Sequence, residues 1–537
     1  MTRLLYLPIV LLLTLPWLNP FAPGPSPSVA PWLLAMVCVA GALCLYAVGG
    51  NTRIHVGAPQ APDWQTLLGA SLLAAGLASC VLALLQYFDL EALSPRWINP
   101  TEPGYAFANL RQRNQFASLT NLALGVLLAW AMRPANGQIN GQINGQMNGP
   151  MNEQINAQMV RQVGGVALAA TALLAVGNAA SSSRTGAVQI IVLCALFGLW
   201  GGWRIGWVRL ILTTAVAVYV AAAVALPLAA GFDWSAHGLF ARLQAGDELC
   251  SSRTTLWSNV LHLTTQKPWL GWGWGELDYA HFITLYDGPR FCDILDNAHN
   301  LPLHLAVELG VPVALLVCGG FAWWAIRQKP WAERDTARQM AWAVLAVILL
   351  HSMLEYPLWY GPFQIAFVLC LLILWRRPMK VANTKNDANY GLNTPLAQVN
   401  SAQRAIITIA SVVGLTAIAY TAWDYHRVSQ IYLQPEARHA AYQVDTLAQA
   451  RKSWLFADQA LFAELILTPL TPATAVQVYA SAGYLLHYSP EPRVVQKLIE
   501  SAVMLGQDAD ALAYLARFKA AFPKEHATWA EKLVGTP

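Results

Sequence analysis

The residues best suited to chemistry are a histidine and several arginines that border long apolar segments. His299 follows the polar run Asp296-Asn297-Ala298 and precedes an apolar segment that begins at Leu301. An imidazole can take a proton from a hydroxyl group near neutral pH, and a guanidinium group can hold diphosphate oxygens through paired hydrogen bonds. Together these residue types predict a transfer reaction in which a diphosphate is the leaving group.

Four polar segments contain the candidate residues, and each borders an apolar block. They are residues 107–117, residues 178–186, the long 232–300 loop and residues 351–360. Polar groups at a membrane boundary are costly unless they are partnered or functional. We expect the arginines to bind a diphosphate, His299 to act as general base or to orient the acceptor hydroxyl, and Glu355 and Tyr356 to orient His299 or an arginine. The candidate residues are, for catalysis, His299, Arg184 and Glu355 and, for binding of diphosphate or glycan, Arg253, Arg113, Arg111, Asn114, Asn300, Tyr356 and Trp272.

Each candidate also has a purely structural interpretation. Arg184 could extend to lipid phosphates, His299 could bond the backbone at a helix N-terminus, and Glu355 could merely pair with an arginine. The loops that carry the candidates lack an Asp-x-Asp motif and any His/Cys/Asp cluster with metal-ligand spacing. We therefore expect no metal and no cofactor, with arginines in the place of a metal ion.

Two of the eight cysteines, Cys250 and Cys292, lie in the longest polar loop, whereas the other six fall within apolar blocks. A disulfide between Cys250 and Cys292 is predicted if this loop lies outside the cytoplasm.

Composition indicates that these segments belong to a membrane protein. Of 537 residues, 56% are hydrophobic and 12% are charged, which is about half the charged fraction of a soluble protein. Many apolar blocks are about as long as a segment that crosses ~30 Å of hydrocarbon. We predict an all-α polytopic membrane protein with about eleven transmembrane helices, at 4–18, 30–49, 66–88, 115–132, 163–180, 187–203, 207–231, 301–326, 340–354, 359–375 and 405–423. The net charge of +4 is small and carries no information about nucleic acid, but the absence of any run of Lys or Arg predicts no nucleic-acid partner.

The distribution of Lys and Arg among the short loops predicts a cytoplasmic N-terminus and an outer C-terminus. The 232–300 loop then lies on the outer side. Several arginines lie there although topology does not require them, and an anionic ligand at that face is the simplest explanation. These outer arginines are Arg96, Arg111, Arg113, Arg184, Arg242, Arg253 and Arg290.

The pattern divides the chain into four parts. Residues 1–133 form an N-terminal transmembrane region, and the Asn/Gln/Gly-rich residues 134–162 form a disordered cytoplasmic linker. Residues 163–423 form a transmembrane core that contains the 232–300 loop. Residues 424–537 show helical periodicity and predict a helical-hairpin domain, for which a tetratricopeptide-like fold is one option.

The motifs resemble one membrane-enzyme superfamily. Ser-Ser-Ser-Arg184-Thr-Gly, Arg253-Thr-Thr-Leu-Trp, Pro-Trp-Leu-Gly-Trp-Gly and Asn297-Ala-His299-Asn300, in this order, are similar to the O-antigen ligase/polymerase superfamily. The Arg-Gln-Arg113-Asn114-Gln-Phe-Ala segment and the helical tail resemble its PglL-like branch, the bacterial protein O-oligosaccharyltransferases. The resemblance implies a GT-C-type fold, an essential histidine in a large periplasmic loop, and periplasmic arginines that engage undecaprenyl diphosphate. The matching positions are His299, Arg184 and Arg253.

The resemblance implies an inner-membrane enzyme that moves a glycan en bloc from undecaprenyl diphosphate to Ser or Thr of an exported protein such as a pilin. The partners would be the lipid-linked donor, the acceptor protein and membrane lipid. The same donor with lipid A core (an O-antigen ligase) or a growing glycan (a polymerase) is the near alternative. A transporter or lipid flippase is the alternative from another class; it predicts charged residues near the bilayer midplane and an internal repeat of helices. The apolar blocks are nearly free of charge.

Overall fold

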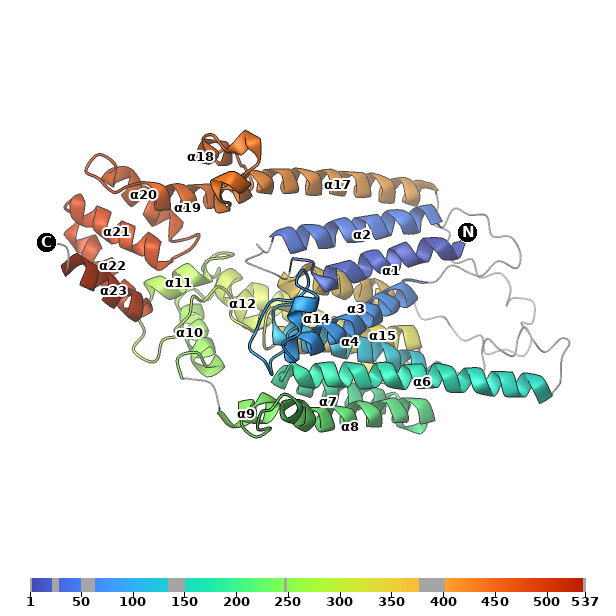
Figure 1. The fold of residues 1–537 in the computed structure, drawn as a ribbon. Helices are drawn as coiled ribbons and strands as arrows, with labels where there is room; N and C mark the ends of the chain where they lie inside the picture. Colours follow the sequence, from blue (N-terminus) through green and yellow to red (C-terminus); the bar gives the residue numbers. More distant parts are fainter. Residues whose placement is uncertain are drawn as a thin grey trace. The chain divides into compact units, whose positions relative to one another are not determined.

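The computed structural model describes residues 2–21, 29–49, 63–133, 150–245, 249–375 and 401–534. Across these ranges the chain forms helices and turns without any β-strand, which confirms the all-α class predicted from the sequence (Figure 1). The chain divides into two compact units, which are described separately. Unit 1 is Met1–Gly246, Gln328–His351 and Pro357–Ile418, and unit 2 is Asp247–Arg327, Ser352–Tyr356 and Ala419–Pro537.

Most helices of unit 1 coincide with predicted apolar blocks. A long apolar block forms a helix because its backbone groups are satisfied internally while its side chains prefer lipid or protein. The helices are α1 (Thr2–Leu18), α2 (Val29–Gly49), α3 (Trp64–Tyr87), α4 (Arg113–Ala131), α6 (Pro150–Ala180), α7 (Arg184–Leu199), α8 (Gly206–Ala229), α9 (Gly238–Ala245), α15 (Thr336–Ser352) and α16 (Gly361–Trp375).

Helix α4 lies at the centre of unit 1. Every residue from Asn114 to Ala129 is buried, as expected for a helix that is surrounded on all sides. It packs against α3, α6 and α7. Its first residue is Arg113, so the most enclosed helix of the unit carries one of the candidate arginines at its N-terminus.

Four segments among the described residues are long and apolar enough to cross a membrane. They are Val29–Tyr46, Trp64–Tyr87, Gly206–Ala229 and Val311–Ala332, and shorter apolar helices occur at Tyr6–Leu18, Gly164–Ala180, Arg184–Leu199 and Gly361–Trp375. The chain is therefore a polytopic membrane protein, while the number of eleven spans stays a prediction.

Two segments differ from the sequence-based expectation. Helix α6 begins at Pro150, so residues 150–162 are helical where the sequence predicted a disordered linker; residues 134–149 lie outside the described ranges. The block predicted at 301–326 is interrupted at Gly310, whose φ of 88° is in the left-handed region. It becomes α12 (Leu301–Leu309), α13 (Val311–Ala314), the π-helical η3 (Leu315–Gly319) and α14 (Gly320–Gln328). The candidate span begins after this break, so α12 precedes it.

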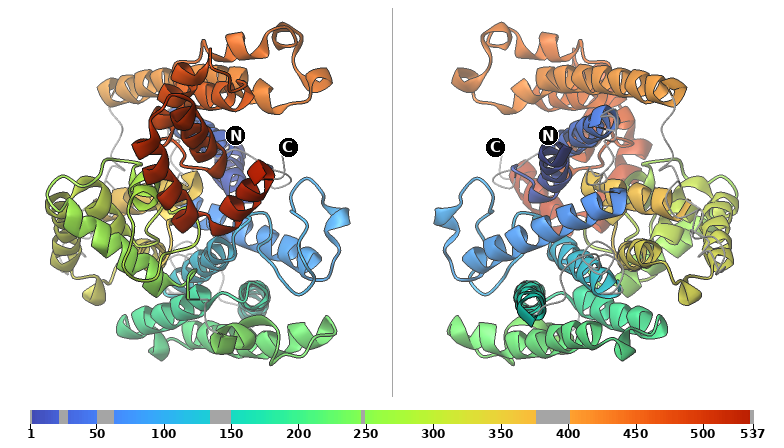
Figure 2. Two further views of the ribbon diagram at one scale, coloured as in Figure 1. Left: turned by 90° about the vertical axis from the view of Figure 1, so that its left-hand side faces the viewer. Right: turned by 90° about the vertical axis from the view of Figure 1, so that its right-hand side faces the viewer.

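Unit 2 combines the polar loop with the tail. The loop contains α10 (Arg253–Gln266) and α11 (Leu277–Ile283), and α17 (Ser401–Ser429) leads into the tail. The tail helices are α18 (Thr446–Ala450), α19 (Ala457–Leu467), α20 (Ala475–Leu485), α21 (Pro492–Met504), α22 (Asp508–Ala521) and α23 (Pro523–Val534). From α19 onward, consecutive helices pack side by side (Figures 1 and 2). The tail is thus a helical domain, and the tetratricopeptide-like fold stays a prediction.

Helix α11 joins the loop to the tail. Leu277 and Ala280 are buried in the loop core with Ala298, the neighbour of His299. Phe282 is buried in the tail core against α20, α21 and α22. Different faces of this one short helix therefore pack into two hydrophobic clusters. Movement of the tail against α11 would be transmitted to the His299 segment.

Asp278 on α11 makes the stability of this junction dependent on pH. The pKa of Asp278 is raised from its ordinary 3.8 to about 7, mainly by burial, with the backbone N–H of Tyr279 lowering it and the nearby Asp296 and Glu276 contributing to the rise. Because the folded-state pKa is raised, the stability that Asp278 contributes is present below about pH 4 and is lost as the pH rises through about 7.

The shift in the pKa of Asp278 corresponds to at most ~4 kcal/mol before solvent screening, which reduces it for a partly exposed group. We therefore expect Asp278→Asn to increase the free energy of unfolding by about 1 kcal/mol at pH 8. The gain should shrink at pH 5, where the carboxyl group is protonated in the folded protein. Thermal unfolding of the purified protein, followed by tryptophan fluorescence at both pH values, measures it. An equal gain at both pH values would contradict this account.

Candidate active site

In unit 2, one carboxylate connects a histidine and an arginine. The Nδ1 atom of His299 lies 3.0 Å from Oε2 of Glu355, and a guanidinium nitrogen of Arg253 contacts the other carboxylate oxygen, Oε1. The side chains of Arg253 and His299 are 29% and 27% exposed, and that of Glu355 is 11% exposed. When Nδ1–H donates to Glu355, Nε2 is the ring nitrogen whose lone pair can accept a proton. The structure therefore brings together three of the predicted residues.

The backbone around His299 is held in an unusual conformation. His299 has a φ of 50°, a region that costs energy for a residue with a side chain and that is often found at functional sites. Its backbone N–H donates to Oδ1 of Asn297 at 2.9 Å. The ring of Tyr356 meets the imidazole edge-on, with the centroids 5.0 Å apart. These contacts fix the direction in which the imidazole extends.

Asn300 links the His299 segment to the turn that carries Glu355. Its Oδ1 accepts from the backbone N–H of Leu303 at 3.1 Å, as an N-cap of α12. Its Nδ2 donates to the carbonyl oxygen of Met353 at 3.1 Å. The sequence predicts a substrate contact for Asn300, whereas these contacts give it a positioning role.

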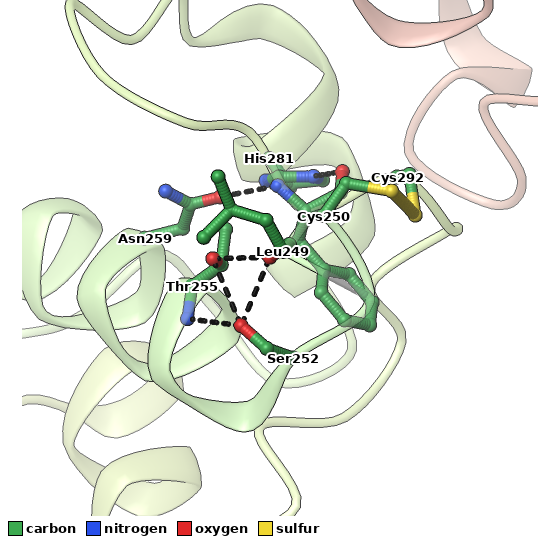
Figure 3. Close-up of a disulfide and its surroundings, with 8 residues drawn as sticks. Leu249, Cys250, Ser252, Thr255, Asn259, His281 and Cys292 are labelled. Carbon is green, nitrogen blue, oxygen red and sulfur yellow. Dashed lines mark hydrogen bonds between the residues drawn. A yellow bond between two sulfur atoms is a disulfide. The ribbon is translucent and has the colours of Figure 1, made fainter. Parts of the chain in front are cut away.

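A disulfide ties the start of α10 to the segment that leads to His299. Cys250 and Cys292, the pair predicted from the sequence, are bonded, with Cα atoms 5.2 Å apart (Figure 3). The backbone N–H of Cys292 also donates to the carbonyl oxygen of Cys250 at 3.2 Å. The hydroxyl of Ser252 caps α10 by accepting from the N–H of Thr255. Arg253 is the first residue of this capped helix, so the disulfide helps to place it.

Trp272 belongs to the core of the loop. Its indole N–H donates to the carbonyl oxygen of Leu263 at 3.0 Å, and the Nζ atom of Lys267 lies 4.0 Å from the ring centroid. Its backbone N–H donates to the carbonyl oxygen of Val307 on α12 at 2.9 Å. Trp272 thus connects α10 and α12, and its contact with a sugar stays a prediction.

In unit 1, a hydrogen bond connects the segments that carry the other candidate arginines. Ser183 caps α7: its Oγ accepts from the N–H of Gly186 at 3.0 Å and donates to Oδ1 of Asn114 at 2.6 Å. Arg184 therefore begins α7 beside the N-terminus of α4, where Arg113 lies. A Cβ on Gly186 would lie 2.4 Å from Oδ1 of Asn178, so this close approach requires glycine.

Two residues of the arginine-bearing turns in unit 1 adopt the left-handed conformation. Arg111 has a φ of 61° and Ser182 a φ of 51°. The carbonyl oxygen of Ser182 accepts from Arg242 at 3.0 Å, and the guanidinium carbon of Arg113 lies 5.8 Å from the ring centroid of Tyr105. The arginine-bearing turns are thus held in one backbone conformation rather than being loose.

A buried polar network that the sequence did not predict lies close to these turns. Nδ2 of Asn121 donates to Oε1 of Gln189 at 2.9 Å, and Nε2 of Gln189 donates to the hydroxyl of Ser118 at 2.8 Å. The same hydroxyl lies 2.9 Å from Nδ1 of His351. These polar residues lie within apolar helices, which is the sequence signal that could have identified them. The network connects α4, α7 and α15.

Two of the arginines that the sequence predicts on the outer side are engaged by the fold itself. Arg290 donates to the carbonyl oxygens of Thr284 and His281, each at 2.8 Å, and Arg242 donates to Ser182 as described. These contacts explain both residues without an anionic ligand. The hypothesis of an arginine-bound diphosphate therefore concerns the other candidates, Arg111, Arg113, Arg184 and Arg253.

The candidates fall into two local sets. His299, Glu355, Arg253, Tyr356 and Asn300 cluster in unit 2, and Arg111, Arg113, Asn114 and Arg184 cluster in unit 1. Among the described residues, no group of three or more His, Cys, Asp or Glu side chains has the geometry to hold a metal ion.

Comparisons with known proteins match much of the chain. Residues 169–318 match the family model described as "O-Antigen ligase", and residues 339–534 match that of "Virulence factor membrane-bound polymerase, C-terminal". The first match contains Arg184, Arg253 and His299, and the second contains Glu355 and the tail.

Two curated proteins of Acinetobacter baylyi are similar over shorter stretches. The "General O-oligosaccharyltransferase" is 28% identical over 126 residues, which is 23% of this chain and 20% of the relative. The "ComP-specific O-oligosaccharyltransferase" is 27% identical over 160 residues, which is 30% of this chain and 27% of the relative. The matches span less than a third of either relative.

Proposed function

The chain belongs to the O-antigen ligase superfamily, and from this membership we propose that it is a protein O-oligosaccharyltransferase. It transfers a preassembled glycan from undecaprenyl diphosphate to a Ser or Thr hydroxyl of an exported protein such as a pilin. The observation that carries the proposal is the contact of Glu355 with both His299 and Arg253, at a partly exposed position within the family-matched segments.

His299 accepts the proton of the acceptor hydroxyl at Nε2, or at least orients that hydroxyl. Glu355 holds the other ring nitrogen and stabilises the imidazolium that forms, as a carboxylate does in other base–orienter pairs. The hydroxyl oxygen then bonds to the anomeric carbon while the bond from that carbon to the phosphate oxygen breaks. Direct displacement of this kind inverts the anomeric configuration.

The arginines stabilise the charge that develops on the leaving diphosphate. Arg253 is fixed by Glu355 beside His299, and Arg184 is assigned to the diphosphate, with Arg113 and Arg111 as supporting residues. Preorganised donors of this kind lower the barrier because their dipoles need no rearrangement during the reaction. In this scheme the arginines take the part that a metal ion plays in other diphosphate-releasing enzymes.

The proposed orientation of the protein in the membrane follows from the distribution of Lys and Arg among the short loops. The N-terminus faces the cytoplasm of a bacterial inner membrane, and the 232–300 loop, the four candidate segments and the tail face the periplasm. The disulfide between Cys250 and Cys292 supports this side, because disulfides persist in oxidising compartments.

The acceptor is the least constrained part of the proposal. The helical tail and the names of the two relatives favour a protein acceptor. The two family descriptions favour a second candidate with the same donor, namely ligation to lipid A core or polymerisation of a glycan.

Reconstitution of the purified protein with a lipid-linked oligosaccharide distinguishes these acceptors. We expect the glycan to appear on a pilin and not on lipid A core when each is offered separately, as read by mass spectrometry of the products. Glycan found on lipid A core alone would assign a ligase, and extension of the donor glycan alone would assign a polymerase.

A further inference from the structure

Unit 2 exposes two tryptophan–leucine pairs at loop positions. Trp269 and Leu270 are 76% and 86% exposed, and Trp454 and Leu455 are 76% and 43% exposed. A lysine precedes each pair in the same pattern, Lys-x-Trp-Leu, beginning at Lys267 and at Lys452. We call these two segments the 267–270 tip and the 452–455 tip. Large apolar side chains that project together from a surface indicate an interaction site.

The 452–455 tip is fixed at the end of an apolar helix. Residues 405–423 of α17 contain no charged side chain, and Asp424 follows them. At 1.5 Å per residue this stretch is about 28 Å long, close to the ~30 Å of a bilayer's hydrocarbon layer. The stretch 405–423 is one of the transmembrane segments predicted from the sequence, and Asp424 is the first charged residue after it.

Asp424 itself holds the tip at the end of this segment. Its Oδ2 atom accepts from the hydroxyl of Ser453 at 2.9 Å and from the backbone N–H groups of Trp454 at 3.0 Å and Leu455 at 2.8 Å. Trp423, the residue before Asp424, is 51% exposed. The tip thus projects beside an aromatic residue at the boundary of the apolar segment.

The 267–270 tip is fixed in the same way at the start of another apolar segment. The candidate membrane span Val311–Ala332 begins directly after Gly310. The N–H of Val311 donates to the carbonyl oxygen of Pro268 at 2.8 Å. A Cβ on Gly310 would lie 2.2 Å from the carbonyl oxygen of Trp269, so only glycine allows the two segments to approach so closely. The first residue of the span and the tip are therefore at one level.

We propose that unit 2 docks on the headgroup region of the phospholipid bilayer through these two tips. Tryptophan prefers the membrane–water interface because its ring is apolar and its N–H is polar. Leu270 and Leu455 would enter the acyl boundary, and Lys267 and Lys452 would lie near anionic phosphates. Each tip is attached to a different apolar segment, so unit 2 has two separate connections to the bilayer in this proposal.

This docking bears on the position of His299. The 267–270 tip continues into Trp272, whose N–H is bonded to Val307 on α12, and α12 begins two residues after His299. A fixed tip therefore fixes the height of His299 above the bilayer. The inference concerns lipid contact and does not depend on the proposed glycan transfer.

Photo-crosslinking of the full-length protein tests the proposal. A benzophenone-bearing phenylalanine analogue replaces Trp269 or Trp454, one at a time, and the protein is reconstituted in vesicles of phosphatidylethanolamine and phosphatidylglycerol. Val476 and Leu512 are the matched control positions, because they are 68% and 66% exposed on tail helices of the same unit. All four side chains are exposed, so the replacements leave the fold intact.

We expect phospholipid adducts, read by mass spectrometry of the crosslinked peptides, at positions 269 and 454 and none at positions 476 and 512. Adducts to a second copy of the chain or to another protein at 269 and 454 would overturn the lipid assignment. Equal lipid adducts at all four positions would show unspecific contact and would overturn it as well. An adduct at only one tip would refute docking through two points.

Discussion

Replacing His299 by Ala is expected to lower the rate of glycan transfer by at least about 100-fold, the usual contribution of a positioned general base. The imidazole is held by Glu355, whose Oε2 lies 3.0 Å from Nδ1, and by the ring of Tyr356, so its orientation is fixed for proton transfer. The measurement is single-turnover transfer from a lipid-linked oligosaccharide at saturating acceptor. His262→Ala is the matched control, because His262 is exposed on α10 of the same unit and makes no contact with Glu355. Full transfer by His299→Ala would remove the catalytic assignment.

Glu355 should act through His299 and Arg253 rather than alone. Residues that work as one group give strongly non-additive effects when they are removed together. We therefore expect Glu355→Ala to slow transfer less in the His299→Ala background than in the wild type. The remaining effect would report the contact with Arg253. Equal effects in both backgrounds would show that Glu355 does not orient His299.

The helices were largely predictable because a membrane segment is recorded in the local composition. Each of the eleven apolar blocks corresponds to one helix or, at 301–326, to a series of helices. The first of two exceptions has a physical reason. Gly310 ends α12 because the chain must pass against Trp269 there, a contact with a distant segment that no local pattern records. The N-terminal part of α6 is helical although its Asn/Gln-rich sequence has little apolar surface to bury.

The sequence predicts which residue types form the candidate site, but only partly which of these residues contact one another. The positions of His299, Glu355 and Arg253 beside apolar blocks predict a common site, and the structure adds that one carboxylate contacts both the imidazole and the guanidinium group. Trp272 and Asn300 are predicted ligand-binding residues, and the structure adds hydrogen bonds from both to backbone carbonyls of the fold. Arg290 shows the same limitation, since its guanidinium group bonds backbone carbonyls. A sequence shows that a polar group needs a partner, but not whether the fold supplies it.

Replacing Arg184 by Ala is expected to slow transfer by about 100- to 1,000-fold, the loss seen when one preorganised donor to a developing negative charge is removed. Arg184 begins α7 on a turn that Ser183 and Asn114 tie to α4. Most of the loss should fall on kcat rather than on KM for the donor, because the charge on the diphosphate increases as its bond to the sugar breaks. Steady-state kinetics with varied lipid-linked donor separates the two.

Substitution by Lys distinguishes bidentate binding of the diphosphate from a general positive charge. A lysine keeps the charge but lacks the planar pair of donors, so Arg184→Lys should recover only part of the rate. Arg96→Ala is the matched control, because Arg96 is an exposed arginine of the same unit outside the candidate turns. If Arg184 only reached lipid phosphates, its replacement by Ala would leave kcat unchanged, as we expect for Arg96. Ser183→Ala removes the hydrogen bond to Asn114 on α4. It should give a smaller loss of rate, since the arginine remains but its turn is no longer held to α4.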